Sequence, residues 1–155
     1  MDDRGLDVSS VVWASEAVYL SIDPSRTTEP ITVERLAERP LILPEARWGN
    51  ADPTRRQLLE RAQNAGVSLS PVVEVESPAL ALTLAARGVG DTVISLPLAR
   101  SLGHLENLRW VSLDPPLPET FAFITRRDAH LSPATRVLME LATKHLGRLE
   151  VPPPR

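Results

Sequence analysis

The stretch of sequence that decides the fold is residues 52–96, DPTRRQLLERAQNAGVSLSPVVEVESPALALTLAARGVGDTVISL. It contains two helix patterns, and each begins with a capping residue and a proline and ends with a glycine. The capping residues are Asp52 and Ser77, and the closing glycines are Gly66 and Gly88. Short β-rich runs precede and follow both helices. This alternation predicts an α/β fold with a mainly parallel central sheet flanked by helices.

Runs rich in β-branched residues mark the expected strands. Leu41–Leu43 lies between two prolines and is continuously apolar, as is typical of a strand buried on both faces. Further strands are predicted at residues 17–22, 72–75, 92–96, 110–113 and 120–124. Pro115, Pro116 and Pro118 should separate the last two strands, because proline cannot donate to a β-ladder.

Two more helices are predicted outside the central stretch. Thr32 caps a short helix that Pro40 stops. Ser132 and Pro133 open a longer helix that carries one apolar stripe, formed by Val137, Leu138, Leu141 and Leu146. Because such a stripe must be buried, we expect this helix to fold back on its own subdomain or to self-associate together with the adjoining edge strand.

Composition disfavours several classes of protein. The 155 residues suit one α/β unit, and 43% hydrophobic with 24% charged residues is typical of soluble globular proteins, not of a membrane span. The net charge is −3 and the basic residues are scattered, so direct nucleic-acid binding is not expected. The chain has no cysteine, and its start, MDDRGLDVSS, lacks the apolar region of a secretory signal. The cytoplasm is therefore the expected location.

The sequence offers no recognisable catalytic or metal-binding motif. His104, His130 and His145 lack the spacing of a metal site, and the chain has neither a GxSxG elbow nor a phosphate-binding glycine loop. The pair Gly88 and Gly90 follows a helix instead of a strand, so a helix stop is its expected role. We therefore expect no catalytic residue, no metal and no cofactor.

The feature that recurs is a strand, then a polar loop, then the N-terminus of a helix. In a parallel sheet these junctions lie along one edge, where ligands bind and free N–H groups favour anions. Every βα unit needs such caps, so ordinary helix capping is the alternative interpretation. Asp52 brings a negative charge to its own helix and disfavours an anion there. Trp48, in the loop before it, could line the mouth of a pocket or cover the core from outside.

Read in order, the segments resemble the effector-binding region of LysR-type transcriptional regulators. The matching stretches cover roughly Ser15 to His145 and are SEAVYLSIDPS, ITVERLAERPLILPE, RRQLLERAQNAGVSLSPVVEVESPALALTLAARGVGDTVISLPLA and DPPLPETFAFITRRDAHLSPATRVLMELA. Members of that family resemble periplasmic binding proteins, with two α/β subdomains, two crossing strands and an effector in the cleft between them. The resemblance implies a periplasmic-binding-protein-like subdomain here.

The same likeness implies a division of the chain. It consists of a remnant of the first subdomain with a crossing strand (residues 1–22), effector-binding subdomain II (23–118), a return crossing strand with the C-terminal helix (119–150) and a tail (151–155). We expect the chain to lack most of the first subdomain, the winged helix-turn-helix and the linker helix.

The family's effector contacts in this subdomain fall at strand ends. The resemblance implies that the corresponding ligand-binding residues here are Pro44, Glu45, Trp48, Glu76, Ser77, Leu96 and Pro97. Many members place a serine or threonine and a glycine just after the first of these strands. Residues 44–49 read PEARWG instead, a bulkier and charged loop.

We interpret the chain as the ligand-sensing portion of a LysR-type regulator that lacks the DNA-binding domain, with a polar or anionic metabolite as its effector. Two alternatives remain open. The chain could be a truncated regulator that acts as an oligomerisation or interaction module, pairing with itself or with intact regulator subunits. It could also be a small enzyme with only a fold-level resemblance to the family.

Overall fold

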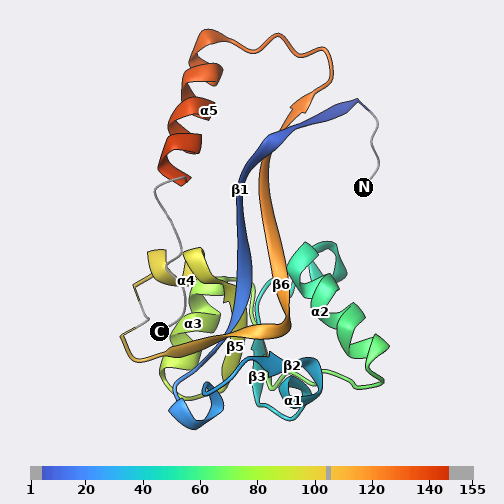
Figure 1. The fold of residues 1–155 in the computed structure, drawn as a ribbon, viewed down its shortest axis with the longest axis vertical. Coiled ribbons are helices and arrows are strands. Elements are labelled where there is room, and N and C mark those ends of the chain that lie inside the picture. Colours follow the sequence, from blue (N-terminus) through green and yellow to red (C-terminus); the bar gives the residue numbers. More distant parts are fainter. Residues whose placement is uncertain (1–4, 104–105, 147–155) are drawn as a thin grey trace. The chain divides into compact units, whose positions relative to one another are not determined.

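The computed structural model describes residues 5–103 and 106–146. The chain divides into two compact units, residues 16–119 and residues 1–15 together with 120–155. The strands (Figure 1) are β1 (Leu6–Ser21), β2 (Ile31–Thr32), β3 (Leu41–Leu43), β4 (Val73–Glu74), β5 (Asp91–Ser95) and β6 (Arg109–Arg126). The helices are α1 (Val33–Ala37), α2 (Pro53–Asn64), α3 (Pro78–Ala86), α4 (Leu96–Ser101) and α5 (Pro133–Leu146), with 3-10 turns η1 (Pro24–Arg26) and η2 (Gly49–Ala51).

The sheet combines parallel and antiparallel neighbours in the order β2-β6-β1-β5-β3-β4. β3 pairs in parallel with β4 and with β5, so that Ile42 lies beside both Val73 and Thr92. β1 pairs antiparallel with β5, with Ala17 beside Ser95. The predicted α/β fold is confirmed, but the sheet is mixed instead of mainly parallel, because β1 runs in the direction opposite to its neighbour β5.

Most of the predicted helix caps and helix stops are confirmed. Asp52 Oδ1 accepts a hydrogen bond from the first turn of α2 at 2.7 Å, and Thr32 caps α1 in the same way. Gly66 and Gly88 adopt left-handed conformations just after α2 and α3, with φ of 71° and 76°. Ser77 stands at the N-cap of α3 as predicted, but its side chain makes no capping hydrogen bond there. Ser77 is an exposed residue at the start of that helix.

The bounds of three strands, β1, β4 and β5, differ from the prediction. β1 begins at Leu6, far ahead of the predicted run 17–22, and it ends at Ser21. β4 is shorter than predicted, and Leu96 begins α4 instead of ending β5. The sequence analysis missed the first part of this strand because Ser9 and Ser10 break the alternation that begins at Leu6, and because the strand's pairing partners lie far away in the sequence.

The prediction of two late strands separated by prolines is wrong, since residues 109–126 form the single strand β6. Proline lacks an N–H but keeps its carbonyl oxygen, so it interrupts a ladder only where that N–H is needed. Arg61 of α2 donates to the carbonyl oxygens of Pro115 and Pro116, the second at 2.6 Å. A helix distant in sequence therefore pairs the acceptors of the proline segment, and the strand continues through it.

The core of the unit 16–119 lies on both faces of the sheet. Leu41 and Leu43 point to one face and Ile42 to the other, and all three are at most 2% exposed. Leu36 of α1 and Leu58 of α2 join the buried cluster of the first face, while α3 packs against β3 and β5. Burying each large apolar side chain contributes about 1.5–3 kcal/mol. This packing fixes the strand ends and the starts of the helices that follow them.

The helix α5, in the second unit, is less buried than the helices α1 to α4 of the unit 16–119. α5 is the helix predicted after Ser132, and Ser132 Oγ accepts from the amide of the first turn at 3.1 Å. The helix has no buried residue, and Val137, Leu138 and Leu141 are 53%, 66% and 59% exposed. The coverage of this stripe therefore stays a prediction. In the part of the chain that the structure describes, no helix is long and apolar enough to cross a membrane.

Candidate functional site

The carboxyl ends of β3, β4 and β5 lie at one edge of the unit 16–119, because the three strands are parallel neighbours. We call residues 44–52, 74–77 and 95–97 the strand-end edge. Ala46 N donates to Val75 O at 3.1 Å, so the pairing of the two chain segments continues beyond β3 and β4. The helices α2, α3 and α4 all begin at this edge.

Among the carboxyl groups that belong to the strand-end edge, the charges of two act on a third. Burial raises the pKa of Glu45, and the negative charges of Asp52 and Glu76 raise it further. Glu45 also has a φ of 60°, in the left-handed region that favours glycine. An anionic group placed beside these carboxylates is repelled, whereas a hydrogen-bond donor or a cation is attracted.

Two oxygen atoms near the helix starts are enclosed and have no hydrogen-bond partner among the described residues. One is Glu119 Oε2, and the other is Ser95 Oγ at the end of β5. The second oxygen of Glu119, Oε1, accepts from Thr54 Oγ1 in the first turn of α2 at 3.0 Å. Buried polar atoms are normally paired with protein or with water, and both oxygens are shielded from solvent, so neither is open to a molecule bound at the surface.

Two arginines bring positive charge to the strand-end edge: Arg47, which is exposed in the loop 44–52, and Arg55, which contacts the edge from α2. The Arg55 guanidinium donates to the Pro44 carbonyl oxygen at 3.2 Å and forms an ion pair with Glu74. The side chain is only 14% exposed. Its charge therefore already has a carboxylate partner within the protein.

The structure places all seven predicted ligand-binding residues at strand ends. Pro44 and Glu45 are half-buried, whereas Trp48 is 63% exposed. Glu76 and Ser77 are exposed after β4, and Leu96 and Pro97 are buried after β5. The accessible residues of the set are Glu45, Trp48, Glu76 and Ser77, while Leu96 and Pro97 are packed into the fold. Their role as effector contacts stays a prediction.

Sequence reasoning missed Arg55, Glu74 and Glu119. Their contacts join residues 19 and 65 positions apart, Arg55 with Glu74 and Thr54 with Glu119. Charged residues on a helix and on a short strand are usually solvated, so neither spacing nor composition singles them out. Only the packing of α2 beside the strand ends brings them together.

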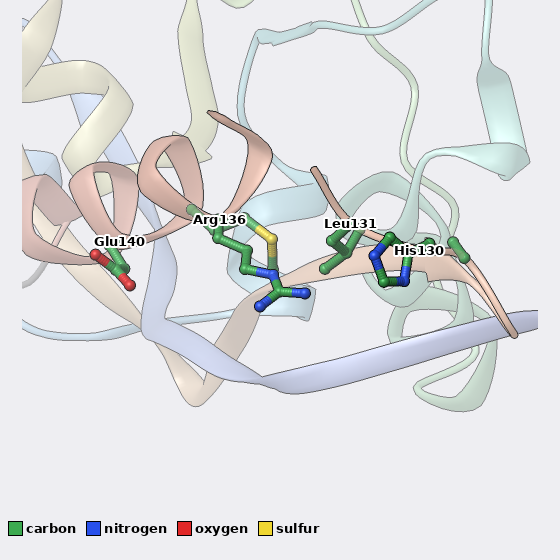
Figure 2. A pocket seen from close by; sticks show the side chains of 6 residues that line it. His130, Leu131, Arg136 and Glu140 are labelled. Carbon is green, nitrogen blue, oxygen red and sulfur yellow. The ribbon is translucent and has the colours of Figure 1, made fainter. Parts of the chain in front are cut away.

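A separate pocket of about 440 Å³ lies beside α5 (Figure 2). It is lined by residues of the loop before α5 and of the first half of that helix, namely Ala129, His130, Leu131, Arg136, Met139 and Glu140. Figure 2 shows that its charged groups, Arg136 and Glu140, come from α5. Since α5 has no buried residue, no core fixes the walls of this pocket. The strand-end edge, which rests on the core, is the stronger candidate.

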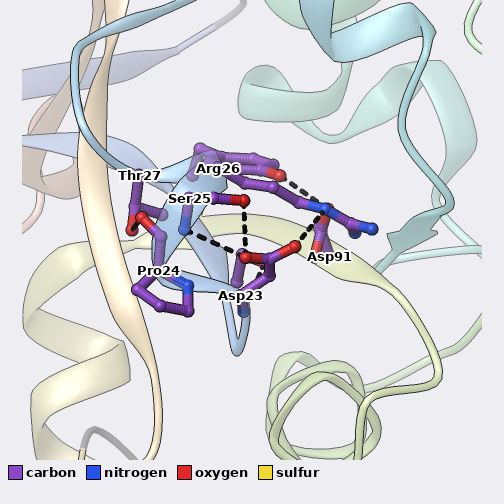
Figure 3. Close-up of polar contacts among 8 residues, drawn as sticks. Asp23, Pro24, Ser25, Arg26, Thr27 and Asp91 are labelled. Atoms are coloured by element: carbon purple, nitrogen blue, oxygen red, sulfur yellow. Dashed lines mark hydrogen bonds and ion pairs between the residues drawn. The ribbon is translucent and has the colours of Figure 1, made fainter.

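A buried polar network lies at the opposite ends of the strands, where β5 begins. Asp91 is the first residue of β5, and its side chain is 2% exposed. Arg26 Nη1 donates to Asp91 Oδ2 at 3.0 Å, and Asp23 pairs with the same arginine at 3.1 Å (Figure 3). Each charge in this group has a partner within the protein, which is the pattern of a structural network.

Metal binding finds no support in the described ranges, 5–103 and 106–146. No group of three or more histidine, cysteine, aspartate or glutamate residues there could hold an ion. His130 and His145 are exposed. His104 lies outside the described residues.

The chain matches the family described as LysR substrate binding domain over residues 6–147. This match covers most of the sequence, and the chain belongs to that family. It has no match among the curated proteins.

Solved structures of LysR regulators share the fold. The chain is similar to the effector binding domain of QuiR in complex with shikimate, with 14% identity, a TM-score of 0.73 and coverage of 95% of this chain and 68% of that chain. It is also similar to the regulatory domain of CcmR from Synechocystis PCC6803 in complex with 2-PG, with 17% identity and a TM-score of 0.74. That match covers 94% of this chain and 69% of that chain. The match to HinK, a LysR family transcriptional regulator from Pseudomonas aeruginosa, has 16% identity and a TM-score of 0.74 and covers 97% of this chain and 52% of that chain. The chain thus spans about half the length of HinK.

Proposed function

We propose that this chain senses a small-molecule effector for a LysR-type transcriptional regulator and that the strand-end edge supplies part of the effector contacts. The observation that carries the proposal is the set of accessible side chains at the ends of neighbouring parallel strands, where α/β sheets bind ligands. Family membership supports the sensing role. A ligand can shift a regulator only by the difference between its affinities for two states, so these contacts must change between the states.

The charge of the edge narrows the class of effector. The effector binding domain of QuiR is in complex with shikimate, and that of BenM, a further solved structure, is with its effector benzoate. In this chain the charges of Asp52 and Glu76 act on Glu45 and raise its pKa, so an anionic group is disfavoured beside Glu45, while the exposed Arg47 supplies one positive charge to the same loop. We therefore narrow the expected polar or anionic effector to a polar molecule that presents hydrogen-bond donors to this edge.

The interaction-module alternative is supported by one specific observation. α5 exposes Val137, Leu138 and Leu141 on one apolar stripe, which suits self-association or pairing with intact regulator subunits. Sensing and pairing are compatible, because a sensor that shifts an oligomer needs both.

We assign no catalytic step and no cofactor, in keeping with a family of regulator domains. A cytoplasmic location follows from the proposed role, since the DNA that such a regulator controls lies there.

The experiment is a ligand titration followed by the fluorescence of Trp48. Trp13→Phe with Trp110→Phe leaves Trp48 as the single tryptophan of the chain. The probes are neutral polyols, small amines, and the carboxylates shikimate and benzoate. We expect a polyol or amine to change Trp48 emission at concentrations about tenfold lower than the carboxylates require, since about 1.4 kcal/mol of charge preference is tenfold in affinity.

Matched variants locate the response. Glu45→Gln should remove the preference for donors and cations, whereas Glu38→Gln, an exposed glutamate after α1, should leave it unchanged. Equal binding of carboxylates and amines, unaffected by Glu45→Gln, would contradict the assignment of the strand-end edge.

A further inference from the structure

Arg55 contacts three residues of the strand-end edge, in its segments 44–52 and 74–77, from the first turn of α2. Its backbone N–H donates to Asp52 Oδ1 at 2.7 Å. Its guanidinium donates from Nη1 to the Pro44 carbonyl oxygen at 3.2 Å and from Nη2 to the Glu74 carboxylate. The Arg55 side chain is 14% exposed, against 46% for Glu74. The guanidinium is therefore held against the protein and not extended into solvent.

The loop that Arg55 contacts has a backbone conformation that needs support. Glu45 occupies the left-handed region, with a φ of 60°, which disfavours residues that carry a side chain. Directly after it, Ala46 N donates to Val75 O at 3.1 Å. Directly before it, Pro44 has no N–H, so its carbonyl is the one backbone group that can be paired, and Arg55 pairs it. The left-handed residue is thus fixed on both sides.

We propose that Arg55 is the positioning residue of the strand-end edge, because it bridges Pro44 and Glu74 and so fixes the loop that presents Glu45 and Trp48. The purpose of this positioning rests on the proposed function, but the positioning itself can be measured without an effector. It adds to the hydrogen bonds within the loop, in which the Glu45 carbonyl oxygen accepts from Trp48 N at 3.1 Å and from Gly49 N at 3.0 Å.

The bridge requires a guanidinium. Its planar set of donors can reach two acceptors at once, whereas the ammonium group of lysine is a single compact charge. Arg56, the next residue of α2, provides a matched control. It is 53% exposed and its ion pair is with Glu60, one turn further along the same helix, at 3.8 Å.

The test is NMR spectroscopy of the full chain without ligand. Two quantities are measured in the wild type, Arg55→Ala, Arg55→Lys and Arg56→Ala, namely the pKa of Glu45 and the exchange rate of the Ala46 amide. In both Arg55 variants we expect the pKa of Glu45 to fall towards its ordinary value, as its carboxyl leaves its half-buried position and the influence of the charges of Asp52 and Glu76. The Ala46 amide should exchange about tenfold faster, as expected for the loss of one supporting hydrogen bond.

The direction of the pKa change separates positioning from charge. Removing a nearby positive charge by itself raises the pKa of a carboxyl group, and Arg55→Lys keeps both the charge and most of the side chain's bulk, so a fall in Arg55→Lys reports movement of the loop. A rise or no change in the pKa of Glu45 in either variant, with the Ala46 amide exchanging as in the wild type, would overturn the proposal. If Arg55→Ala does not fold, Arg55→Lys, which keeps the charge, decides the outcome alone. Arg56→Ala should leave both quantities unchanged.

Failure of the proposed function has a different signature. In that case the loop depends on Arg55 as expected, yet no polyol, amine or carboxylate probe changes the emission of Trp48 in the wild type.

Discussion

The hydroxyl of Tyr19 donates a hydrogen bond to Asp91 Oδ2 at 2.5 Å, in the interior of the unit 16–119. Tyr19 lies on β1 and Asp91 at the start of β5, and neither side chain is more than 2% exposed. Arg26 donates to the same carboxylate oxygen at 3.0 Å. The contact therefore joins the antiparallel strand β1 to the parallel part of the sheet and satisfies a buried charge at the same time.

Asp91→Asn should lower the free energy of unfolding by about 2–3 kcal/mol, because hydrogen bonds to a charged group are the stronger ones and Arg26 loses its buried partner. Urea denaturation followed by circular dichroism measures this loss. Glu60→Gln removes an exposed carboxylate that pairs with Arg56 at 3.8 Å, and it should change stability by less than about 1 kcal/mol. Equal effects of the two substitutions would contradict the structural role of Asp91.

The same contact predicts a dependence on alkaline pH. Burial raises the pKa of Tyr19 first, and the hydrogen bond to Asp91 and its charge add to this. A group whose pKa is higher in the folded state contributes stability that is complete below its unfolded value, about 10, and that is lost as the pH rises above it. Wild-type stability should therefore fall above about pH 10 more steeply than that of Tyr19→Phe. Parallel curves for the two proteins between about pH 9 and pH 11, with the unfolding free energy measured in urea, would show that Tyr19 is not the group responsible.

Gly90 should tolerate no side chain. A Cβ at this position would lie 2.2 Å from the Pro40 carbonyl oxygen, the same atom that accepts from Asp91 N at 2.8 Å. Gly90→Ala must therefore break the junction of β3 and β5, and we expect a loss of about 3 kcal/mol or more, as for other severe steric changes in a core. Gly66→Ala is the control, because Gly66 has open space around it and only a left-handed φ to strain, which costs about 1–2 kcal/mol. Thermal unfolding of both variants compares them, and a similar loss in each would argue against the close approach at Gly90.

The exposed stripe of α5 should mediate self-association. Leu138→Glu with Leu141→Glu places two charges on the stripe and should weaken the association at least tenfold, since each buried leucine contributes about 1.5–3 kcal/mol. Sedimentation equilibrium over a range of concentrations measures this. Thr143→Glu adds a charge to another exposed position of α5 and serves as the control. A wild-type chain that stays monomeric at high concentration would refute the prediction.

Much of the fold could be predicted because its signals are local. Asp52 and Thr32 form the predicted caps, Gly66 and Gly88 end their helices, and Leu41–Leu43 is buried on both faces as its continuous apolar run indicates. Caps, helix stops and apolar runs act within a few residues of the chain, so the sequence around each position is sufficient. The resemblance to LysR regulators rests on the order of these local elements.

The sequence by itself determined the helices, the buried central strands and the family to which the chain belongs. The tertiary structure alone decided that β6 continues through its prolines, where Arg61 pairs their carbonyl oxygens, and that Arg55 ties together the strand ends. It also decided that Tyr19 meets Asp91, 72 residues away in the sequence. Each of these contacts is made by a polar side chain whose partner is distant in the chain. Such a partner is selected by the packing of helices on the sheet, which no local pattern of residues records.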